Sequence, residues 1–503
     1  MNLKVAIIGA GIVGTAIARL LSKYENVEVH ILEKNADVGW GASKANTAII
    51  HPGHEEDPDK HPLRAKLCVK GNKIWHRWVK ELDIPAKWPG ELMLAFSDED
   101  LKTAEKYLEL GKKNDVPGVR FVYGEELRGL EPNVSPDAVG ALWAPTAGQL
   151  APWEAIIALT ENAVENGAKL HTETEVRKIR IENGKVKGVE TNNGFIEADI
   201  VINTAGLYAD QISKTAGVDF EIHPRKGEYY LFEEDAFPKV NRIVHQTPTP
   251  ITKGVYLATT VEGNLMIGPT AEDLPVEAKE DTSTSRKGLD FVWKWAQKLV
   301  AKLPPKGRVM KTFAGLRPEP PGGRWIIEAY DNPWGFVNAA GMRSPALASA
   351  PAIAEYVVEE LLKKKLKLNL REKENWNPYR KGIRRLREAP EEEKEKLIRE
   401  NPKYGNVVCM CKEISEAEII EAIERMQKIG IKTITLDGIK FRTTSMFGWC
   451  QGSFCRVRIA KIVSEKLGIP LWEVATKERG IGYGIGNVKI FFLKGRGDEK
   501  NER

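Results

Sequence analysis

The chain opens with a predicted strand, a glycine-rich turn and a helix in immediate succession. Residues 3–8 form an apolar run rich in β-branched side chains, and Gly9, Gly11 and Gly14 follow in the spacing Gly-x-Gly-x-x-Gly. Apolar residues from Ile12 onward then recur at helical spacing. In this order the first glycine permits a tight turn, the second lets the backbone approach a pyrophosphate, and the third lets helix and strand pack closely. The opening residues therefore predict an α/β domain that binds a dinucleotide.

A second strand and an acidic residue complete the pattern. Residues 27–32 predict a second strand, and Glu33 follows it. A carboxylate at this point accepts hydrogen bonds from ribose hydroxyl groups and repels the 2′-phosphate of NADP. The N-terminus of the first helix, with its unbonded N–H groups, faces the pyrophosphate. We therefore expect the dinucleotide to contact Gly9, Gly11, Ile12, Val13, Gly14, Glu33 and Lys34.

The residues that come next favour FAD over NAD. Residues 39–50 combine glycine and alanine with Ser43, Asn46 and Thr47, which we expect to line an isoalloxazine ring. Here the chain resembles the flavoprotein family of glycerol-3-phosphate dehydrogenases and D-amino-acid oxidases. In that family a Gly-x-Ser segment precedes a stretch beneath the flavin, which implies FAD as the cofactor.

Later segments extend this resemblance and predict a discontinuous cofactor domain. Val176 follows a short strand and occupies the position of the family's adenine-side contact. Two Asn-Gly pairs, at 183–184 and 193–194, predict hairpin turns of a small β-meander. A buried strand at 200–203 leads to the next expected cofactor contacts, Ala205 and Gly206.

The last cofactor segment follows a predicted strand at 335–340. Apolar residues from 347 to 362 recur at helical spacing, with Ser344 as a fitting N-cap and Pro345 as a fitting first helical residue. The family places its corresponding helix N-terminus at the flavin's pyrimidine edge, where it stabilises the negative charge of the reduced ring. The expected contacts are Gly341, Met342, Arg343, Ser344 and Pro345, of which Arg343 is atypical for the family.

Two segments, 71–150 and 216–320, interrupt the cofactor domain. The second contains the phrases PRKGEYYL, GNLMIGPTAED and TFAGLRP, and it resembles the family's antiparallel substrate-binding sheet. These phrases resemble FAD-dependent glycerol-3-phosphate dehydrogenases of the anaerobic type more closely than amino-acid oxidases. The resemblance covers the chain from the first strand to about residue 365 and resumes at the C-terminal cysteines. We interpret Trp75 and Trp78, three residues apart in the first segment, as core.

Three cations are candidates for binding an anionic substrate. Arg317 lies in Phe-Ala-Gly-Leu-Arg-Pro, which predicts a rigid turn, and the family's matching arginine binds the substrate's anionic group. Arginine suits phosphate because its donors are directed, although a carboxylate fits it too. Arg324 and Lys253 are the second and third candidates. His51, at a position where related enzymes place a histidine near the flavin, is the candidate base for the substrate hydroxyl.

Four of the five cysteines lie in the last hundred residues. They form a Cys-x-Cys pair and, 38 intervening residues later, a Cys-x4-Cys pair. Four thiolates satisfy one metal centre, and zinc knuckles usually separate the close pair by two residues rather than one. The layout and the phrase TTSMFGWCQGSFC resemble the [2Fe–2S] domain of bacterioferritin-associated ferredoxins. This resemblance implies a [2Fe–2S] cluster, with zinc as the alternative, on Cys409, Cys411, Cys450 and Cys455.

Charge and helix signals surround these cysteines. The segment 366–400 is dense in charge and includes Arg380. We interpret it as a solvated linker or a docking face for an acidic partner, and the net charge of +5 gives no support for nucleic-acid binding. Ser415 and Glu418 form a capping box, which predicts a helix just after the first cysteine pair. A second helix is expected near Cys455.

Together these features predict an α/β protein of three parts: a Rossmann-like FAD-binding domain, an α+β antiparallel-sheet substrate domain and a small helical iron–sulfur domain. The expected boundaries are 1–70, 151–215 and 321–365 for the FAD-binding domain, 71–150 and 216–320 for the substrate domain, 366–400 for the linker, 401–475 for the cluster domain and 476–503 for a tail.

The resemblance implies oxidation of sn-glycerol 3-phosphate to dihydroxyacetone phosphate. Electrons are expected to leave the flavin through the cluster to an acceptor protein or a further subunit. Dehydrogenation of 2-hydroxyglutarate or proline, and a non-catalytic electron-transfer subunit, are the alternatives. The apolar stretch at 346–362 is broken by three glutamates, so no transmembrane segment is expected. We expect a cytoplasmic protein, with association at the inner face of the membrane through a partner left open.

Overall fold

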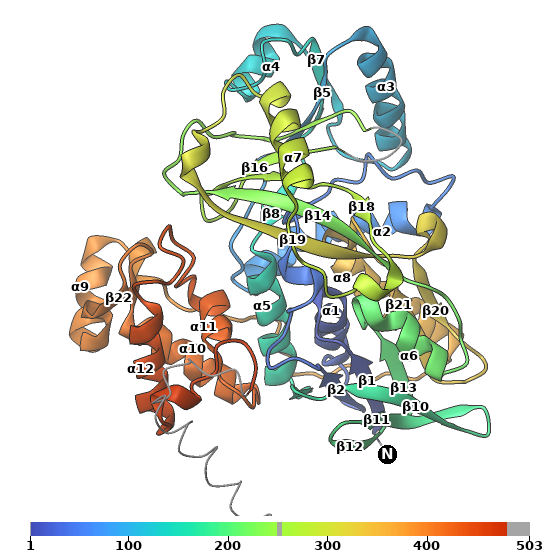
Figure 1. Ribbon diagram of the computed structural model, residues 1–503. Coiled ribbons are helices and arrows are strands. Elements are labelled where there is room, and N and C mark those ends of the chain that lie inside the picture. The colour runs from blue at the N-terminus through green and yellow to red at the C-terminus, as the bar shows by residue number, and fades with distance from the viewer. Residues whose placement is uncertain (1, 249–253, 480–503) are drawn as a thin grey trace, which may run out of the picture. The chain divides into compact units, whose positions relative to one another are not determined.

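The structure, a computed structural model, describes residues 2–248 and 254–479 (Figure 1). The chain divides into two compact units. Unit 1 comprises Met1–Lys34 and Val38–Gly382, and unit 2 comprises Asn35–Asp37 and Ile383–Arg503. The cofactor and substrate segments expected from the sequence therefore belong to unit 1, and the C-terminal cysteines belong to unit 2.

The first sheet of unit 1 has six strands in the order β20-β21-β13-β1-β2-β9, with bounds β1 Leu3–Ile8, β2 Val27–Leu32, β9 Lys169–His171, β13 Ile200–Asn203, β20 Ile326–Ala329 and β21 Phe336–Ala340. The strands from β21 to β9 are parallel, whereas β20 runs antiparallel to β21. The central strands β1 and β13 are mostly buried, as expected of a parallel sheet covered on both faces. The predicted strands at 3–8, 27–32 and 200–203 are confirmed.

Five helices pack around this sheet: α1 Ile12–Leu21, α2 Pro62–Glu81, α5 Pro152–Glu165, α6 Ala209–Thr215 and α8 Ala346–Tyr356. The helix α1 contacts both α5 and α8, and α2 packs along α8. Trp75 and Trp78 of α2 are fully buried, which confirms their interpretation as core. The chain continues from α8 as a π-helix over Val357–Lys365.

A small antiparallel sheet contains β10 Val176–Glu182, β11 Lys185–Thr191 and β12 Gly194–Glu197. Asn183 and Gly184 both have positive φ in the turn between β10 and β11. Asparagine followed by glycine tolerates this conformation best among common residue pairs. Both hairpins predicted from the Asn-Gly pairs are therefore confirmed.

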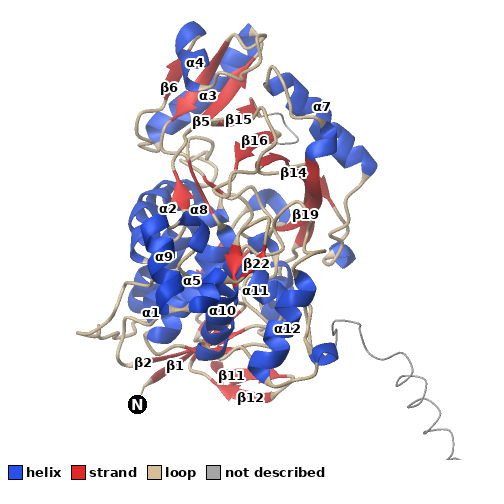
Figure 2. Cartoon of the chain, turned by 90° about the vertical axis from the view of Figure 1, so that its left-hand side faces the viewer, coloured by secondary structure: helices blue, strands red, loops and turns tan. Residues whose placement is uncertain are grey.

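The second large sheet of unit 1 has nine strands in the order β18-β14-β17-β16-β15-β5-β7-β6, with β19 paired to β14. Its pairs are antiparallel except that β15 and β5 are parallel. The bounds are β5 Glu91–Ala95, β6 Arg120–Val122, β7 Gly140–Ala144, β14 His223–Phe232, β15 Ile243–Gln246, β16 Tyr256–Thr259, β17 Leu265–Gly268, β18 Glu272–Asp273 and β19 Val309–Glu319. In both views of unit 1, α1 and α8 lie between this sheet and the parallel sheet (Figures 1 and 2).

Short elements complete unit 1. The helices α3 Asp98–Lys113, α4 Gly124–Leu130 and α7 Arg286–Leu299 pack on the nine-stranded sheet. A three-stranded sheet joins β3 Ile49–Ile50, β8 Gly148–Leu150 and β4 Ala86–Lys87. Among the described residues, no helix combines the length and apolarity needed to cross a membrane.

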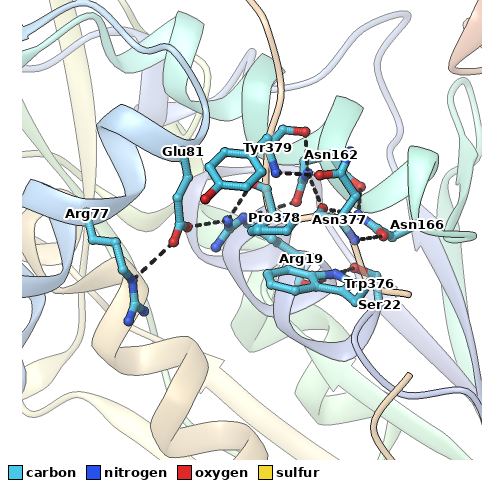
Figure 3. Close-up of polar contacts among 10 residues, drawn as sticks. All are labelled: Arg19, Ser22, Arg77, Glu81, Asn162, Asn166, Trp376, Asn377, Pro378 and Tyr379. Atoms are coloured by element: carbon cyan, nitrogen blue, oxygen red, sulfur yellow. Dashed lines mark hydrogen bonds and ion pairs between the residues drawn. The ribbon is translucent and has the colours of Figure 1, made fainter. Parts of the chain in front are cut away.

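The end of unit 1 is a segment that crosses helices α1, α2 and α5 (Figure 3). Arg19 of α1 donates to Glu81 Oε2 at 2.7 Å and to the carbonyl oxygen of Pro378 at 3.1 Å. Asn162 of α5 donates to the carbonyl oxygen of Asn377 at 3.0 Å. These buried polar contacts hold residues 376–379 against the helices.

The solvated interpretation of Arg380 is wrong. Its side chain is buried and forms ion pairs with Glu161 at 2.7 Å and Glu154 at 2.9 Å, both on α5. Burial alone would lower the pKa of Arg380, but the two carboxylates raise it above its ordinary value. The cation is retained inside because it is paired twice.

Unit 2 is mostly helical (Figure 2). It contains α9 Glu391–Glu400, α10 Glu416–Lys428, α11 Leu436–Thr443 and α12 Arg456–Leu467, with a two-stranded sheet of β22 Val407–Cys409 and β23 Ile414–Ser415. The predicted capping box is present, because Ser415 accepts from the backbone of Glu418 and the Glu418 side chain accepts from the backbone of Ser415. The second predicted helix, near Cys455, is α12.

Candidate active site

The glycine turn lies between β1 and α1. Gly9 has a φ of +98°, and a Cβ at this position would lie 2.8 Å from the carbonyl oxygen of Thr204. A Cβ at Gly14 would overlap the carbonyl oxygen of Gly9. The two glycines are therefore needed for the turn itself and for the close packing of α1 on it. Gly11 is the N-cap of α1, and Ile12 and Val13 form its first turn.

Glu33 reaches back to this turn from the end of β2. Its Oε2 accepts a hydrogen bond of 2.9 Å from the backbone N–H of Ala10, and the side chain is buried. This is the place of the ribose-binding carboxylate in a dinucleotide site. Lys34, the next residue, lies at the surface, where its Nζ is 3.8 Å from the ring of Tyr208 and 3.5 Å from Glu280.

The segment after Glu33 folds over the start of α1. Ser43 accepts a hydrogen bond of 3.1 Å from the backbone N–H of Ile12, which belongs to the first turn of α1. Asn46 donates to the carbonyl oxygen of Ser43 and accepts from the backbone N–H of Ala48, each at 2.8 Å. Thr47 lies half-buried in the same loop. The three predicted residues are thus part of one closed loop at the helix N-terminus.

The end of β13 lies directly against the glycine turn. The Thr204 hydroxyl donates to the carbonyl oxygens of Ile8 at 2.8 Å and Gly9 at 3.0 Å. Ala205 and Gly206 follow at once, and Val176 packs in the same apolar cluster as Ile8. The turn is lined by backbone and small residues beside a helix N-terminus and a buried carboxylate, so the residues present fit FAD.

The predicted cap at the start of α8 is wrong. The helix begins at Ala346 with Pro345 at the N-cap position and no side-chain cap, so Ser344 is not the cap and Pro345 is not the first helical residue. The reason is that the Ser344 hydroxyl is directed elsewhere: its Oγ lies 3.2 Å from His51 Nε2. Three predicted contacts precede Ser344 in the chain: Gly341, Met342 and Arg343. Met342 is buried, and Arg343 Nε lies 3.3 Å from Glu319 Oε1.

His51 lies in the loop after β3 and is buried. Its Nε2 faces Ser344, and its Nδ1 lies 3.9 Å from Glu55 Oε2. Asn72 of α2 donates to the carbonyl oxygens of Ile50 and His51 at 3.3 Å each, which fixes the backbone of the loop. The structure therefore brings the candidate base together with Ser344 of the predicted cofactor segment.

Arg317 does not lie in a turn, as its sequence predicted, but inside the long strand β19. It stands opposite Arg225 of β14, and Pro318 stands opposite Pro224. Proline is tolerated on an edge strand, where its missing N–H breaks no ladder bond, so the Arg-Pro pair does not force a turn. The guanidinium donates to the carbonyl oxygen of Thr270 at 3.0 Å.

The side chain of Arg317 lies over Gly227 of β14, the glycine of the PRKGEYYL phrase. A Cβ at Gly227 would overlap the Arg317 guanidinium, so only glycine leaves room for it. Two residues earlier on β19, Gly315 packs so closely on Ala45 that a Cβ would overlap the carbonyl oxygen of Ala45. The strand that carries Arg317 therefore runs against the loop that contains Ser43 and Asn46.

The other two candidate cations differ from Arg317. Arg324 is 76% exposed, and its guanidinium pairs with Glu328 on the same hairpin. The structure does not bring it together with the residues above. Lys253 lies outside the described residues.

The four C-terminal cysteines lie together in unit 2. Cys409 ends β22, and Cys455 is the N-cap residue of α12. The sulfurs of Cys409 and Cys411 are 3.9 Å apart, and those of Cys411 and Cys450 are 3.8 Å apart. A Cβ at Gly448 would overlap the Cys411 sulfur, so the loop before Cys450 closes tightly on the group.

This loop is suited to a thiolate. Thr444, Met446, Gln451 and Gly452 all have positive φ, so the backbone turns sharply on both sides of Cys450. Burial alone would raise the pKa of Cys450, but the backbone N–H groups of Phe454 and Gly452 help to hold it below its ordinary value. Four cysteine thiolates in one place are the ligand set of a [2Fe–2S] cluster, so the residues present fit this group.

Sequence reasoning did not single out Glu55, Glu319 or Thr270. Glu55 could have been noticed because it follows His51 by four residues in the same loop. Glu319 and Thr270 reach the site through strand pairing between distant segments, and no spacing in the sequence signals their proximity.

Comparison with known proteins gives the same picture for both units. Residues 4–360 match the model of the family described as FAD dependent oxidoreductase. Residues 407–465 match the family described as BFD-like [2Fe-2S] binding domain.

Individual relatives differ in how much of this chain they cover. A protein of Caloramator mitchellensis named glycerol 3-phosphate dehydrogenase is 40% identical over 477 residues, covering 95% of this chain and 97% of the relative. A protein of Mycoplasma genitalium named glycerol 3-phosphate oxidase is 32% identical and covers 75% of this chain and 98% of the relative. Dithionite-reduced L-alpha-glycerophosphate oxidase from Mycoplasma pneumoniae with FAD bound has a TM-score of 0.69 at 30% identity, covering 76% of this chain and 99% of that one.

Proposed function

This chain belongs to the family of FAD-dependent oxidoreductases, and we propose that it oxidises sn-glycerol 3-phosphate to dihydroxyacetone phosphate. The observation that carries the proposal is the 40% identity over 95% of the chain with a relative named glycerol 3-phosphate dehydrogenase. That similarity includes the region of the cysteines, whereas the relatives named oxidase leave about a quarter of this chain unmatched.

The cofactor is held by the residues around the glycine turn. Gly9, Gly11 and Gly14 admit the pyrophosphate to the N-terminus of α1, and Glu33 accepts from the ribose. The loop with Ser43, Asn46 and Thr47 and the segment 341–345 bound the ring. The flavin, when bound, supplies a two-electron acceptor for the hydride of the substrate carbinol carbon.

The substrate is held by Arg317 and deprotonated by His51. Arg317 binds the phosphate through directed donors, and Gly227 gives its side chain the room to lie flat on β14. His51 Nε2 takes the hydroxyl proton, because an imidazole titrates near neutral pH and this nitrogen faces Ser344 at the cofactor segment.

Cys409, Cys411, Cys450 and Cys455 would hold a [2Fe–2S] cluster, which would supply a one-electron outlet for the flavin. A flavin takes up two electrons at once and an iron–sulfur cluster passes them singly, so both on one chain suit transfer to an external protein or subunit rather than to oxygen. Cys68, buried in α2 of unit 1, is not one of the ligands.

A visible absorption spectrum under anaerobic conditions tests the proposal. Addition of glycerol 3-phosphate should bleach the flavin band, and the cluster band should follow as electrons move on. Bleaching by 2-hydroxyglutarate or proline instead would assign Arg317 to a carboxylate and overturn the substrate. If none of the three compounds bleaches the flavin, although dithionite still reduces it, the result would favour a non-catalytic electron-transfer subunit.

A further inference from the structure

A row of buried polar side chains leads from His51 into the interior of unit 1. Glu55 Oε2 lies 3.9 Å from His51 Nδ1, and Glu55 Oε1 accepts a hydrogen bond of 3.1 Å from the Tyr256 hydroxyl. Tyr256 comes from β16, whereas His51 and Glu55 belong to the loop after β3. The Glu55 side chain is 4% exposed. A carboxylate removed so far from water must be stabilised by such neighbours.

The row continues beyond Tyr256. The Tyr256 ring stacks on His245 with 4.3 Å between ring centroids and 14° between planes. Fully buried Glu91 lies 3.8 Å from His245 Nε2 and 3.4 Å from His54 Nε2. Burial alone would raise the pKa of Glu91, but the two imidazoles hold it below its ordinary value. Glu91, His54 and His245 therefore form a second buried group of titratable side chains, distinct from the Glu55 carboxylate.

Tyr256 stays a hydrogen-bond donor at working pH. Burial, together with the charge of Glu55, raises the pKa of Tyr256 well above its ordinary value. A neutral phenol donates to a carboxylate and cannot repel it. The Tyr256 hydroxyl thus fixes one oxygen of Glu55 and leaves the other directed at His51.

We propose that Glu55 is a positioning residue for His51, held in place by Tyr256. The carboxylate keeps the proton of the neutral imidazole on Nδ1, so that Nε2 is the acceptor, and it offsets the positive charge that His51 gains. The proposal rests on the proposed role of His51 as base. In that step the substrate O–H bond breaks and its proton goes to Nε2. The carbinol C–H bond breaks with it, and its electron pair leaves as hydride to the flavin, which gives the C=O bond of the product.

Four further contacts of His51 involve its backbone oxygen, its ring edge and Nε2, whereas Glu55 lies beside Nδ1. Cys68 Sγ and Asn72 Nδ2, both on α2, lie 3.7 Å and 3.3 Å from the backbone oxygen of His51. The Tyr256 ring of β16 meets the imidazole edge-on at 6.2 Å. Ser344 lies at Nε2, the side from which the proton arrives.

Histidine NMR tests the proposal without substrate. The chain has eight histidines, so selective 13Cε1 labelling gives a countable set of signals, and the His51 signal is assigned by its loss in His51→Gln. Glu55→Gln should lower the pKa of His51 by about one unit, because a nearby carboxylate favours imidazolium. Glu56→Gln is the matched control, since Glu56 pairs with Arg64 rather than His51. An unchanged His51 titration in Glu55→Gln would overturn the proposal.

The rate of anaerobic flavin reduction adds a second readout. Glu55→Gln should slow reduction by glycerol 3-phosphate at least about tenfold with little change in KM, since general bases contribute about 10²- to 10⁴-fold. The acid limb of the pH profile should move to lower pH, and Glu55→Asp should restore part of the rate. Tyr256→Phe should slow flavin reduction less than Glu55→Gln does. If the wild type is not reduced by glycerol 3-phosphate, the proposed substrate fails while the NMR titration still decides on Glu55.

Discussion

At the scale of single residues, the substrate proposal depends on one arginine among several. Arg317→Met should raise the KM for glycerol 3-phosphate about 10- to 100-fold, because a hydrogen bond to a charged group contributes about 1.5 to 3 kcal/mol. Arg317→Lys should recover part of this, since lysine keeps the charge without the directed pair of donors. The matched control is Arg324→Met, whose exposed guanidinium pairs with Glu328. Steady-state kinetics with a dye acceptor measure all three, and a larger effect at Arg324 would reverse the assignment.

Gly227 allows a sharper test of the same contact. Gly227→Ala should displace the Arg317 guanidinium, because the added methyl group would overlap it. We expect a higher KM with flavin content unchanged. Gly129→Ala on α4 is the control, as its Cβ would meet no atom within 4 Å. Equal KM values in Gly227→Ala and Gly129→Ala would mean that substrate binding does not require the Arg317 guanidinium to lie over Gly227.

Some residues of the site could be predicted from the sequence, and others could not. Glycines, Glu33 and the cysteines could be predicted because their chemistry depends on local spacing. The predictions of a turn at Arg317 and of a cap at Ser344 were wrong, because contacts with residues far away in the sequence determine both conformations. β14 pairs with Arg317 across the sheet, and His51, 293 positions away, faces the Ser344 hydroxyl. Neither partner is visible from neighbouring residues.

At the scale of secondary-structure elements, buried strands were predicted best. The bounds of β1, β2 and β13 agree with the predicted strands. The clearest case is β13, which is buried along its whole length, as expected of a strand covered on both faces. The order of the nine-stranded sheet could not be predicted. Its strands come from two segments that interrupt the parallel sheet in sequence, and pairing such as β5 with β15 leaves no local pattern.

The capping box of α10 gives a prediction at this scale. Ser415→Ala should destabilise the helix by about 1 kcal/mol, since it removes an N-cap acceptor. The midpoint for thermal loss of the cluster absorption should fall. Ser97→Ala is the matched control, because Ser97 caps α3 in unit 1 with the same type of bond. Its effect should appear in flavin release and leave the cluster midpoint unchanged.

The polar contacts across α1, α2 and α5 give another (Figure 3). Arg19 is 1% exposed, between the rings of Trp78 at 4.5 Å and Trp376 at 5.2 Å. Arg19→Met should lower the free energy of unfolding of unit 1 by about 3 kcal/mol, because Glu81 and the carbonyl oxygen of Pro378 lose a buried donor. Arg77→Met removes a second partner of the same Glu81. Because Arg77 is 63% exposed, this change should lower the free energy of unfolding by less than about 0.5 kcal/mol. Denaturant unfolding followed by flavin fluorescence compares the two, and similar losses would contradict the role of burial.

At the scale of the whole molecule, the chain joins an oxidoreductase unit to a cluster unit. Each has its own core, and each matches its own family. The substrate half-reaction should therefore survive when the cluster is lost, and only the delivery of electrons to a one-electron acceptor should suffer. A fold in which the cluster merely braced the flavin site would behave differently, because both steps would then fail together.

Cys450→Ser separates these two cases. The variant should lose the cluster absorption, keep its flavin and be reduced by glycerol 3-phosphate at nearly the wild-type rate under anaerobic stopped flow. Reoxidation of that reduced flavin by a one-electron protein acceptor should slow by at least about tenfold. Met410→Leu, a change at an exposed residue between Cys409 and Cys411, is the control and should keep both phases. A Cys450→Ser protein with slow flavin reduction and normal flavin content would show that the cluster supports the active site, whereas unchanged reoxidation would show that electrons leave by another route.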